Sequence, residues 1–319
     1  MNIRDLAKKI QNFFSETNQI RRIVIYAAIA LGLALMSFGG YYYWDRYVHL
    51  GDESPVSMSI NELERAAQEH PDNIEIRLAL AESYMLDTQY DRAIQQASVV
   101  LNAYPDNERA MFIVGVGYAS SGRPEESLAP LEKFTKIRAA APTASLDSSL
   151  ETALFYLGNS YINLGRYEEA IPKLSQALTI NSTDADAFYL LGQAYTETGQ
   201  HEQAVQNYQE AVRFVPNFAE AYQGMAESYT ALDRPEYAAY ARGMVAFSKG
   251  NYSAARRDLE HAAQTLSDYA PLYVGLGLAC EELGDLASAE AHLKRALEID
   301  PYDFTATQAL GRVQSVMQK

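Results

Sequence analysis

The chain has 319 residues, a formal net charge of −15 at pH 7, 48% hydrophobic residues and one cysteine. Such an acidic surface repels phosphate backbones, so a nucleic-acid-binding protein, which needs a basic stripe, is excluded. A single cysteine forms no intramolecular disulfide, and neither a CxxC motif nor a closely spaced pair of histidines occurs. Redox, haem-attachment and zinc functions therefore lack their ligands.

Residues 23–43 form an uncharged apolar segment near the N-terminus. At about 1.5 Å per residue, a helix of this length crosses the roughly 30 Å hydrocarbon layer of a bilayer. The aromatic run that ends the segment, at residues 41–44, suits the interfacial belt of a membrane protein. We predict a transmembrane helix over residues 23–44. A cleaved signal peptide is the alternative, but its apolar core spans about 7 to 15 residues, and no clean A-x-A site follows here.

Basic residues are unevenly distributed around this segment. Residues 1–22 contain five of them, whereas Arg46 is the only one in the 20 positions that follow residue 43. The positive-inside rule then predicts a cytoplasmic tail over residues 1–22 and a single-pass orientation. Residues 45–57 would be a linker, and residues 58–319 would lie across the membrane, in the periplasm or another extracytoplasmic space.

Seven segments within residues 74–303 repeat one pattern of small and aromatic residues at a regular step of 34 residues. The eighth and twentieth positions of every segment are Gly, Ala or Ser. Two helices cross closely only where side chains are small, so each segment is predicted to be a helix pair. Glycine occupies the fifteenth position of five segments, where a left-handed backbone can end the first helix. The segments begin at Ile74, Glu108, Glu151, Ala185, Ala219, Glu236 and Ala270.

This pattern resembles the tetratricopeptide repeat, as in the block LGNSYINLGRYEEA at residues 157–170. The resemblance implies an all-α fold, a right-handed superhelical α-solenoid, preceded here by the transmembrane helix. A half-repeat over residues 58–73 would open the array, and a capping helix over residues 304–319 would close it.

Two irregularities interrupt the period. Nine extra residues near 139–150 predict a lengthened loop and helix start. The step at 219–236 is 17 residues, half a repeat, so the helix over 236–249 is predicted to serve two repeats at once. Arg242 falls in that helix where an apolar residue normally packs. We expect the curvature of the solenoid to change there.

No catalytic motif occurs with a spacing that chemistry requires, such as GxSxG, HExxH or a P-loop. We therefore predict that the protein is not an enzyme and holds no cofactor or metal. In the tetratricopeptide family the first helix of each repeat lines a concave groove. Carried over by position, the candidate groove residues are Phe112, Phe155, Asn159, Tyr189, Gln193, Glu197, Gln223, Glu227, Tyr237 and Tyr240.

These residues combine aromatics, amides and acids. The family clamps acidic chaperone tails with a Lys at the fifth position of a repeat, and that position holds Leu78, Phe112, Phe155 and Tyr189 here, so the clamp is absent. The resemblance then implies partners that are proteins or extended peptides of apolar or basic character. A second interpretation is that the aromatics only complete the hydrophobic core.

We expect a non-catalytic, membrane-anchored interaction scaffold or client-holding adaptor in the bacterial cell envelope, which contacts the lipid bilayer of the inner membrane through residues 23–44. An accessory subunit of a membrane enzyme complex is an alternative. An organelle import receptor is another, which the missing clamp makes less favoured.

Overall fold

A computed structural model of the chain describes residues 2, 4–9 and 59–318. Residues 4–9 are helical. The predicted transmembrane helix over residues 23–44 and the linker over 45–57 lie outside the described residues. Among the helices that are described, none is both long enough and apolar enough to cross a membrane. The chain divides into two compact units, residues 1–80 and 81–319, and each is treated separately below.

The described part of the first unit contains α2 (Ile60–Glu69) and the start of α3 (Ile74–Leu86). A reciprocal capping box begins α2: the Ser59 hydroxyl accepts a hydrogen bond from the Glu62 backbone N–H, and the Glu62 carboxylate accepts one from the Ser59 backbone N–H at 2.8 Å. The hydrogen bonds from Ser59 lower the pKa of Glu62. Leu63 forms the buried side of this short helix.

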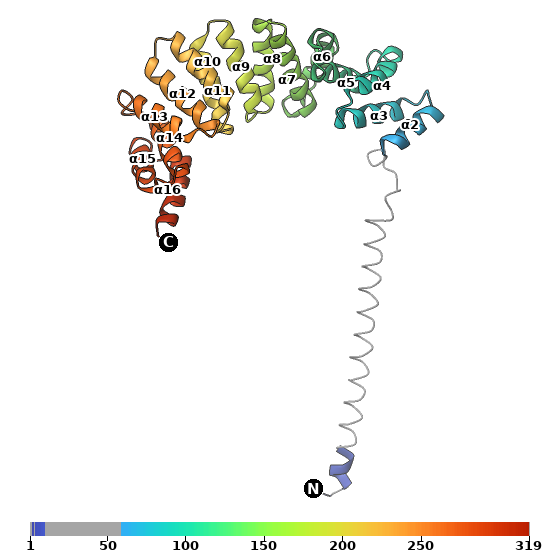
Figure 1. Ribbon diagram of the computed structural model, residues 1–319. Helices are drawn as coiled ribbons and strands as arrows, with labels where there is room; N and C mark the ends of the chain where they lie inside the picture. The colour runs from blue at the N-terminus through green and yellow to red at the C-terminus, as the bar shows by residue number, and fades with distance from the viewer. Residues whose placement is uncertain (1, 3, 10–58, 319) are drawn as a thin grey trace. The chain divides into compact units, whose positions relative to one another are not determined.

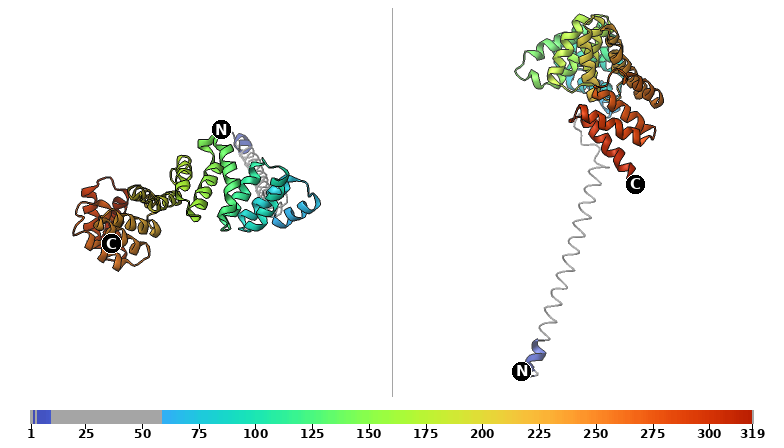
Figure 2. Two further views of the ribbon diagram at one scale, coloured as in Figure 1. Left: turned by 90° about the horizontal axis from the view of Figure 1, so that it is seen from above. Right: turned by 90° about the vertical axis from the view of Figure 1, so that its left-hand side faces the viewer.

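The second unit is an array of helices without a strand in its described residues, as predicted for an all-α fold. Neighbouring helices pack against each other in chain order, and Figures 1 and 2 show the array from three sides. After α3 its helices are α4 (Tyr90–Ala103), α5 (Glu108–Ser120), α6 (Pro124–Ala139), α7 (Ser148–Asn163), α8 (Tyr167–Ile180), α9 (Ala185–Glu197), α10 (His201–Phe214), α11 (Ala219–Ala231), α12 (Pro235–Ser248), α13 (Tyr252–Ala262), α14 (Ala270–Glu282), α15 (Leu286–Ile299) and α16 (Phe304–Met317).

The small residue at the eighth position of a repeat is where its two helices approach most closely. A Cβ atom placed on Gly158 of α7 would lie 2.6 Å from Cγ of Leu174 on α8. A Cβ atom on Gly192 of α9 would lie 2.7 Å from Cε1 of Tyr208 on α10. Real Cβ contacts are not this short, so a large side chain from the second helix occupies the space that glycine leaves.

The turn between the two helices of a repeat places its fifteenth residue in the left-handed region. The five glycines at this position have φ between 68° and 76°. Thr88 and Asp233 occupy the same position in the other two repeats, with φ of 58° and 56°. The next backbone N–H then donates to the carbonyl of the eleventh residue, as from Arg166 to Tyr161 at 2.8 Å. This bond closes the turn in the manner of a Schellman motif.

The nine-residue insertion extends α6, adds the 3₁₀ turn η2 (Ala144–Leu146) and lengthens the start of α7. Asp147 caps α7 by accepting hydrogen bonds from the backbone N–H groups of Ser149 and Leu150. Its carboxylate also pairs with Arg138 at 2.6 Å, and Arg138 reaches Glu108 on α5 at 3.2 Å. The hydrogen bond from Arg138 lowers the pKa of Asp147, which ties the insertion to the preceding repeat.

The half-repeat step gives α12 two roles. It packs closely against α11 as the second helix of one repeat and as closely against α13 as the first helix of the next. A Cβ atom on Gly243 of α12 would lie 2.7 Å from Cγ of Leu259 on α13, the same contact that the eighth position makes elsewhere. Arg242, one residue earlier, is exposed.

This double role changes which helices face one another across the array. Before the step, α5 contacts α7, α7 contacts α9, and α9 contacts α11; we call these four helices the odd row. After it, α12 contacts α14 and α14 contacts α16, and we call these three the even row. The surface lined by first helices therefore passes from the odd row to the even row at α12.

Candidate protein-binding surfaces

A cleft of about 290 Å³ lies between α9 and α11 of the odd row. Its floor is Tyr208 of α10, which is buried. Gly224 makes room for this ring, since a Cβ atom there would lie 2.6 Å from the tyrosine hydroxyl. We call this surface the acidic cleft. It is lined by Tyr189, Gln193, Thr196, Glu197, Tyr208, Glu220, Gln223, Gly224 and Glu227.

Hydrogen bonds fix the floor of the acidic cleft. The hydroxyl groups of Thr196 and Tyr208 lie 3.2 Å apart, and that of Thr196 lies 3.2 Å from the hydroxyl of Ser228. Burial raises the pKa of Tyr208, so its phenol is neutral at physiological pH. The floor therefore offers an aromatic surface without charge.

The rim of the acidic cleft carries the carboxylates of Glu197, Glu220 and Glu227, all on exposed residues. No basic residue lines the cleft, and within residues 59–318 none of the three carboxylates forms an ion pair. Glu227 accepts a hydrogen bond from Gln223 at 3.1 Å. No grouping of acidic, His or Cys side chains in the described residues is arranged to hold a metal ion. In the described residues the rim is thus a negative surface whose three carboxylates form no ion pair, and Arg242 lines an adjoining hollow together with Glu227.

Tyr189 forms the aromatic wall of the acidic cleft. Its half-buried ring lies 5.0 Å from the ring of Phe218 and 6.0 Å from that of Tyr208, centroid to centroid. Burial raises the pKa of Tyr189, and the charges of Glu220 and Glu227 add to the effect. An aromatic face beside carboxylates attracts a cation both through the ring and through Coulomb interaction. The cleft is therefore suited to a Lys or Arg side chain.

A second cavity on the odd row, of about 440 Å³, differs in charge. Its acids and bases are already paired: Arg109 binds Glu82 at 2.9 Å, and Arg138 binds Glu108. Phe112 forms its apolar wall and packs 5.3 Å from the ring of Phe134. Met85 and Leu86 complete this N-terminal pocket, whose surface is apolar with little net charge.

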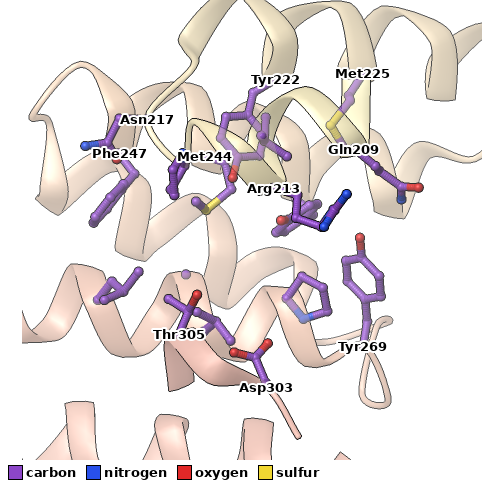
Figure 3. Close-up of a pocket in the computed structure, with 17 residues that line it drawn as sticks. Gln209, Arg213, Asn217, Tyr222, Met225, Met244, Phe247, Tyr269, Asp303 and Thr305 are labelled. Atoms are coloured by element: carbon purple, nitrogen blue, oxygen red, sulfur yellow. The ribbon is translucent and has the colours of Figure 1, made fainter. Parts of the chain in front are cut away.

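A third cavity, of about 380 Å³, lies on the even row (Figure 3). Its walls come from α10, α11, α12, α14 and the start of α16. We call it the C-terminal pocket. Its inner wall consists of Tyr222, Met225, Tyr240, Met244, Phe247 and Val274, and Gln209, Arg213, Asn217, Asp303 and Thr305 are among the polar residues around them.

The structure divides the predicted groove residues among these surfaces. Tyr189, Gln193, Glu197, Gln223 and Glu227 meet in the acidic cleft, and Phe112 lines the N-terminal pocket. Phe155 and Asn159 are half-buried on α7 and line none of the three cavities described here.

The two tyrosines of the half-repeat step lie apart from the acidic cleft. Tyr240 is only 4% exposed and lines the C-terminal pocket. The ring of Tyr237 packs 5.2 Å from Tyr229 and 5.3 Å from Tyr269. These two tyrosines belong to a packed aromatic cluster, because α12 has changed rows.

Sequence reasoning missed Glu220, Thr196 and Tyr208 of the acidic cleft. The resemblance assigns the second and twelfth positions of a repeat, among others, to the groove. Glu220 and Thr196 occupy these two positions, so the same rule identifies both when it is applied to every repeat. Tyr208 comes from a second helix and reaches the cleft only because Gly192 and Gly224 leave space for its ring. The repeat spacing of residues on the first helices does not predict that contact.

Paired helices stacked in one direction define an α-solenoid repeat protein. Family models identify the repeat. A model described as "TPR repeat" matches residues 158–199 and 192–233, and two described as "Tetratricopeptide repeat" match residues 59–111 and 240–304. Together the matches cover more than half of the sequence. The chain is a tetratricopeptide repeat protein.

Solved structures are similar to the chain at low sequence identity. YrrB, described as a TPR protein with an unusual peptide-binding site, is 17% identical, with a TM-score of 0.52, over 65% of this chain and 100% of its own. MamA from Desulfovibrio magneticus RS-1 is 19% identical, with a TM-score of 0.49, over 56% of this chain and 96% of its own. No curated protein matches the sequence significantly. The likeness to YrrB supports the solenoid fold.

Proposed function

We propose that this protein is a non-catalytic scaffold, anchored in the bacterial inner membrane, that holds protein clients in the cell envelope through its tetratricopeptide solenoid. The observation that carries the binding role is the acidic cleft, where three carboxylates that form no ion pair within residues 59–318 surround one aromatic wall. Such a rim steers basic segments toward the cleft and gains energy when a cation replaces solvent there. The peptide-binding site reported for YrrB, which shares the fold, supports the same use of a solenoid surface.

The ligand of the acidic cleft would be an extended client segment that carries Lys or Arg. A cation over Tyr189 would lie beside Glu220 and Glu227, while Gln193 and Gln223 are positioned to hydrogen-bond a peptide backbone. Anchoring rests on the uncharged residues 23–43 and on the basic residues that precede them.

Peptide binding tests the role of the cleft. The full-length chain is titrated with acetyl-(Ala-Lys)₃-amide and acetyl-(Ala-Glu)₃-amide, and the dissociation constants are measured at several salt concentrations. Only the basic peptide should bind, and the double variant Glu197→Gln/Glu227→Gln should weaken it about tenfold at low salt. The matched control Glu202→Gln, on an exposed residue of α10 outside the cleft, should change little. Equal binding of both peptides would refute this role.

Protease accessibility tests the anchor. In spheroplasts, added protease should degrade residues 58–319 and spare the first 22 residues, and deletion of residues 23–44 should release the protein from the membrane fraction. Protection of the repeats in intact spheroplasts would reverse the proposed orientation. Gentle solubilisation then separates a client-holding scaffold, which associates with many substoichiometric proteins, from an accessory subunit, which associates with one fixed complex.

A further inference from the structure

The C-terminal pocket is a product of the half-repeat step. Helix α10 contributes Tyr208 to the acidic cleft, and the next residue, Gln209, lines the C-terminal pocket. Helix α11 is divided in the same way: Gln223 faces the cleft, whereas Tyr222 and Met225 face the pocket. The two surfaces therefore lie on different sides of α11, and a ligand in one leaves the other accessible.

The walls of the C-terminal pocket are apolar and adaptable. Met225 and Met244 line the cavity together with Tyr222 and Tyr240. Gly275 brings the α14 backbone close, since a Cβ atom there would lie 2.6 Å from the Met244 sulfur. Methionine side chains adjust their shape to a bound group and make favourable contacts with aromatic rings. The volume of about 380 Å³ is within the range of protein cavities that bind ligands.

Two polar side chains around the pocket already have partners. Gln209 donates a hydrogen bond to the Tyr229 hydroxyl at 3.2 Å, and Arg213 pairs with Glu210. Burial raises the pKa of Tyr222 to about 12, so its phenol is uncharged at physiological pH. Asp303 caps α16 through the Ala306 backbone N–H at 2.7 Å. In residues 59–318 it forms no ion pair, and Figure 3 shows its carboxylate at the edge of the cavity.

Two exposed aromatic residues flank Asp303 in the sequence, and neither of them lines the cavity itself. Tyr302 and Phe304, on either side of Asp303 in the sequence, are 94% and 71% exposed. Exposed aromatics next to a residue that lines an apolar cavity favour a protein-interaction surface, in which a central pocket receives an anchor and the surrounding surface excludes water.

We propose that the C-terminal pocket binds one aromatic or long aliphatic side chain of a partner segment whose adjacent Lys or Arg faces Asp303. The apolar walls accept the anchor, and the carboxylate of Asp303 supplies the complementary charge. Because this pocket and the acidic cleft are separate, the chain has two peptide sites of different chemistry and can bridge two segments. This inference goes beyond the proposed function, which requires only the acidic cleft.

Methionine NMR tests the proposal. The full-length chain carrying [methyl-¹³C]methionine is titrated with acetyl-Lys-Phe-Lys-amide and with acetyl-Lys-Ala-Lys-amide, which have the same charge. The phenylalanine peptide should shift the methyl signals of Met225 and Met244 in a saturable way, and the alanine peptide should not. Thr305→Trp, which fills the pocket from an exposed edge, should weaken this binding about tenfold or more. Gln308→Trp, exposed on α16 outside the pocket, is the matched control and should change it less than about twofold.

Two results would overturn the proposal. Equal shifts of Met225 and Met244 with both peptides would show that no anchor enters the pocket. Shifts confined to Met85 would place the phenylalanine in the N-terminal pocket instead. The comparison of the two peptides on the unmodified chain stands even if Thr305→Trp fails to fold. The variant Glu197→Gln/Glu227→Gln should leave the Met225 and Met244 shifts unchanged, so failure of the acidic cleft and failure of this pocket are distinguishable.

Discussion

The odd row and the even row follow the same repeat code but present different surfaces. Along the odd row, consecutive first helices leave a cleft whose rim carries three carboxylates. Along the even row, α10 and α11 form one wall and α12, α14 and α16 form the rest, and the cavity is lined by tyrosines and methionines. The difference arises from one half-repeat step. In a solenoid, a half-repeat step therefore alters the chemistry of the exposed surface without altering the packing rule.

The largest expected effect tests whether α12 is a first helix toward α13. Gly243→Leu should lower the free energy of unfolding by about 3 kcal/mol, because its side chain would meet Leu259 at a distance that allows no Cβ atom. Its neighbour Arg242 is exposed, so Arg242→Leu should change stability by less than about 0.5 kcal/mol. Denaturant melts of the full-length chain measure both. Similar losses for the two variants would mean that α12 packs only as the second helix of its repeat.

A second prediction compares the inserted junction with a regular one. Asp147→Ala should cost about 2 kcal/mol, because it removes a helix cap and the ion pair with Arg138. Asp184→Ala at the start of α9 removes a cap that forms no ion pair within residues 59–318, and it should cost about 1 kcal/mol. Thermal melts at neutral pH give this difference, and equal losses would contradict it.

The lowered pKa of the Asp147 carboxylate predicts that the stability of the fold depends on pH. The folded-state pKa of Asp147 is lowered, so the charged form stabilises the fold above the unfolded pKa of about 4. This contribution should be lost as the pH falls from about 5 through the folded pKa. Asp147→Asn should therefore be less stable than the parent at pH 7 and approach it at acidic pH. A constant gap across that range would mean that the charge of Asp147 contributes nothing.

A third prediction separates a surface tyrosine of the odd row from a buried one of the even row. Tyr189→Ala should weaken binding of acetyl-(Ala-Lys)₃-amide about tenfold with little change in melting temperature, because the half-buried ring forms the wall of the acidic cleft. Tyr240→Ala should instead destabilise the fold and leave the affinity of the folded fraction unchanged. Unfolding of Tyr189→Ala would show that its ring serves the core.

The smallest expected effect concerns the turn residue. Thr88→Gly should raise stability by about 0.5 to 1 kcal/mol, since Thr88 has φ of 58°, a conformation that costs a β-branched residue energy and glycine little. Gly199→Thr should lower it by a similar amount at the same position of another repeat. If Thr88→Gly were neutral, contacts of the threonine side chain would have to offset the backbone strain.

Some of the candidate site could be predicted from one sequence and some could not. Tyr189, Glu197 and Glu227 followed from repeat positions, because residues on one face of consecutive first helices share a surface. Tyr208 did not, because a second-helix ring reaches that surface only through space left by two glycines. Tyr240 obeyed the same positional rule but lies in another pocket, since the rule assumes that first helices stay in one row.

The sequence by itself determined the all-helical solenoid, the phase of its repeats and the location of the half-repeat step, because small residues at close crossings and glycines at turns are local requirements that recur with the period. At two of these turns, Thr88 and Asp233 adopt the left-handed backbone conformation that glycine adopts at the other five. The sequence does not predict this conformation for Thr or Asp, because the packing of the two flanking helices imposes it. Only the tertiary structure decided which helices face each other after α12. That choice depends on how whole helices pack around one shared element, and no single position of the sequence encodes it.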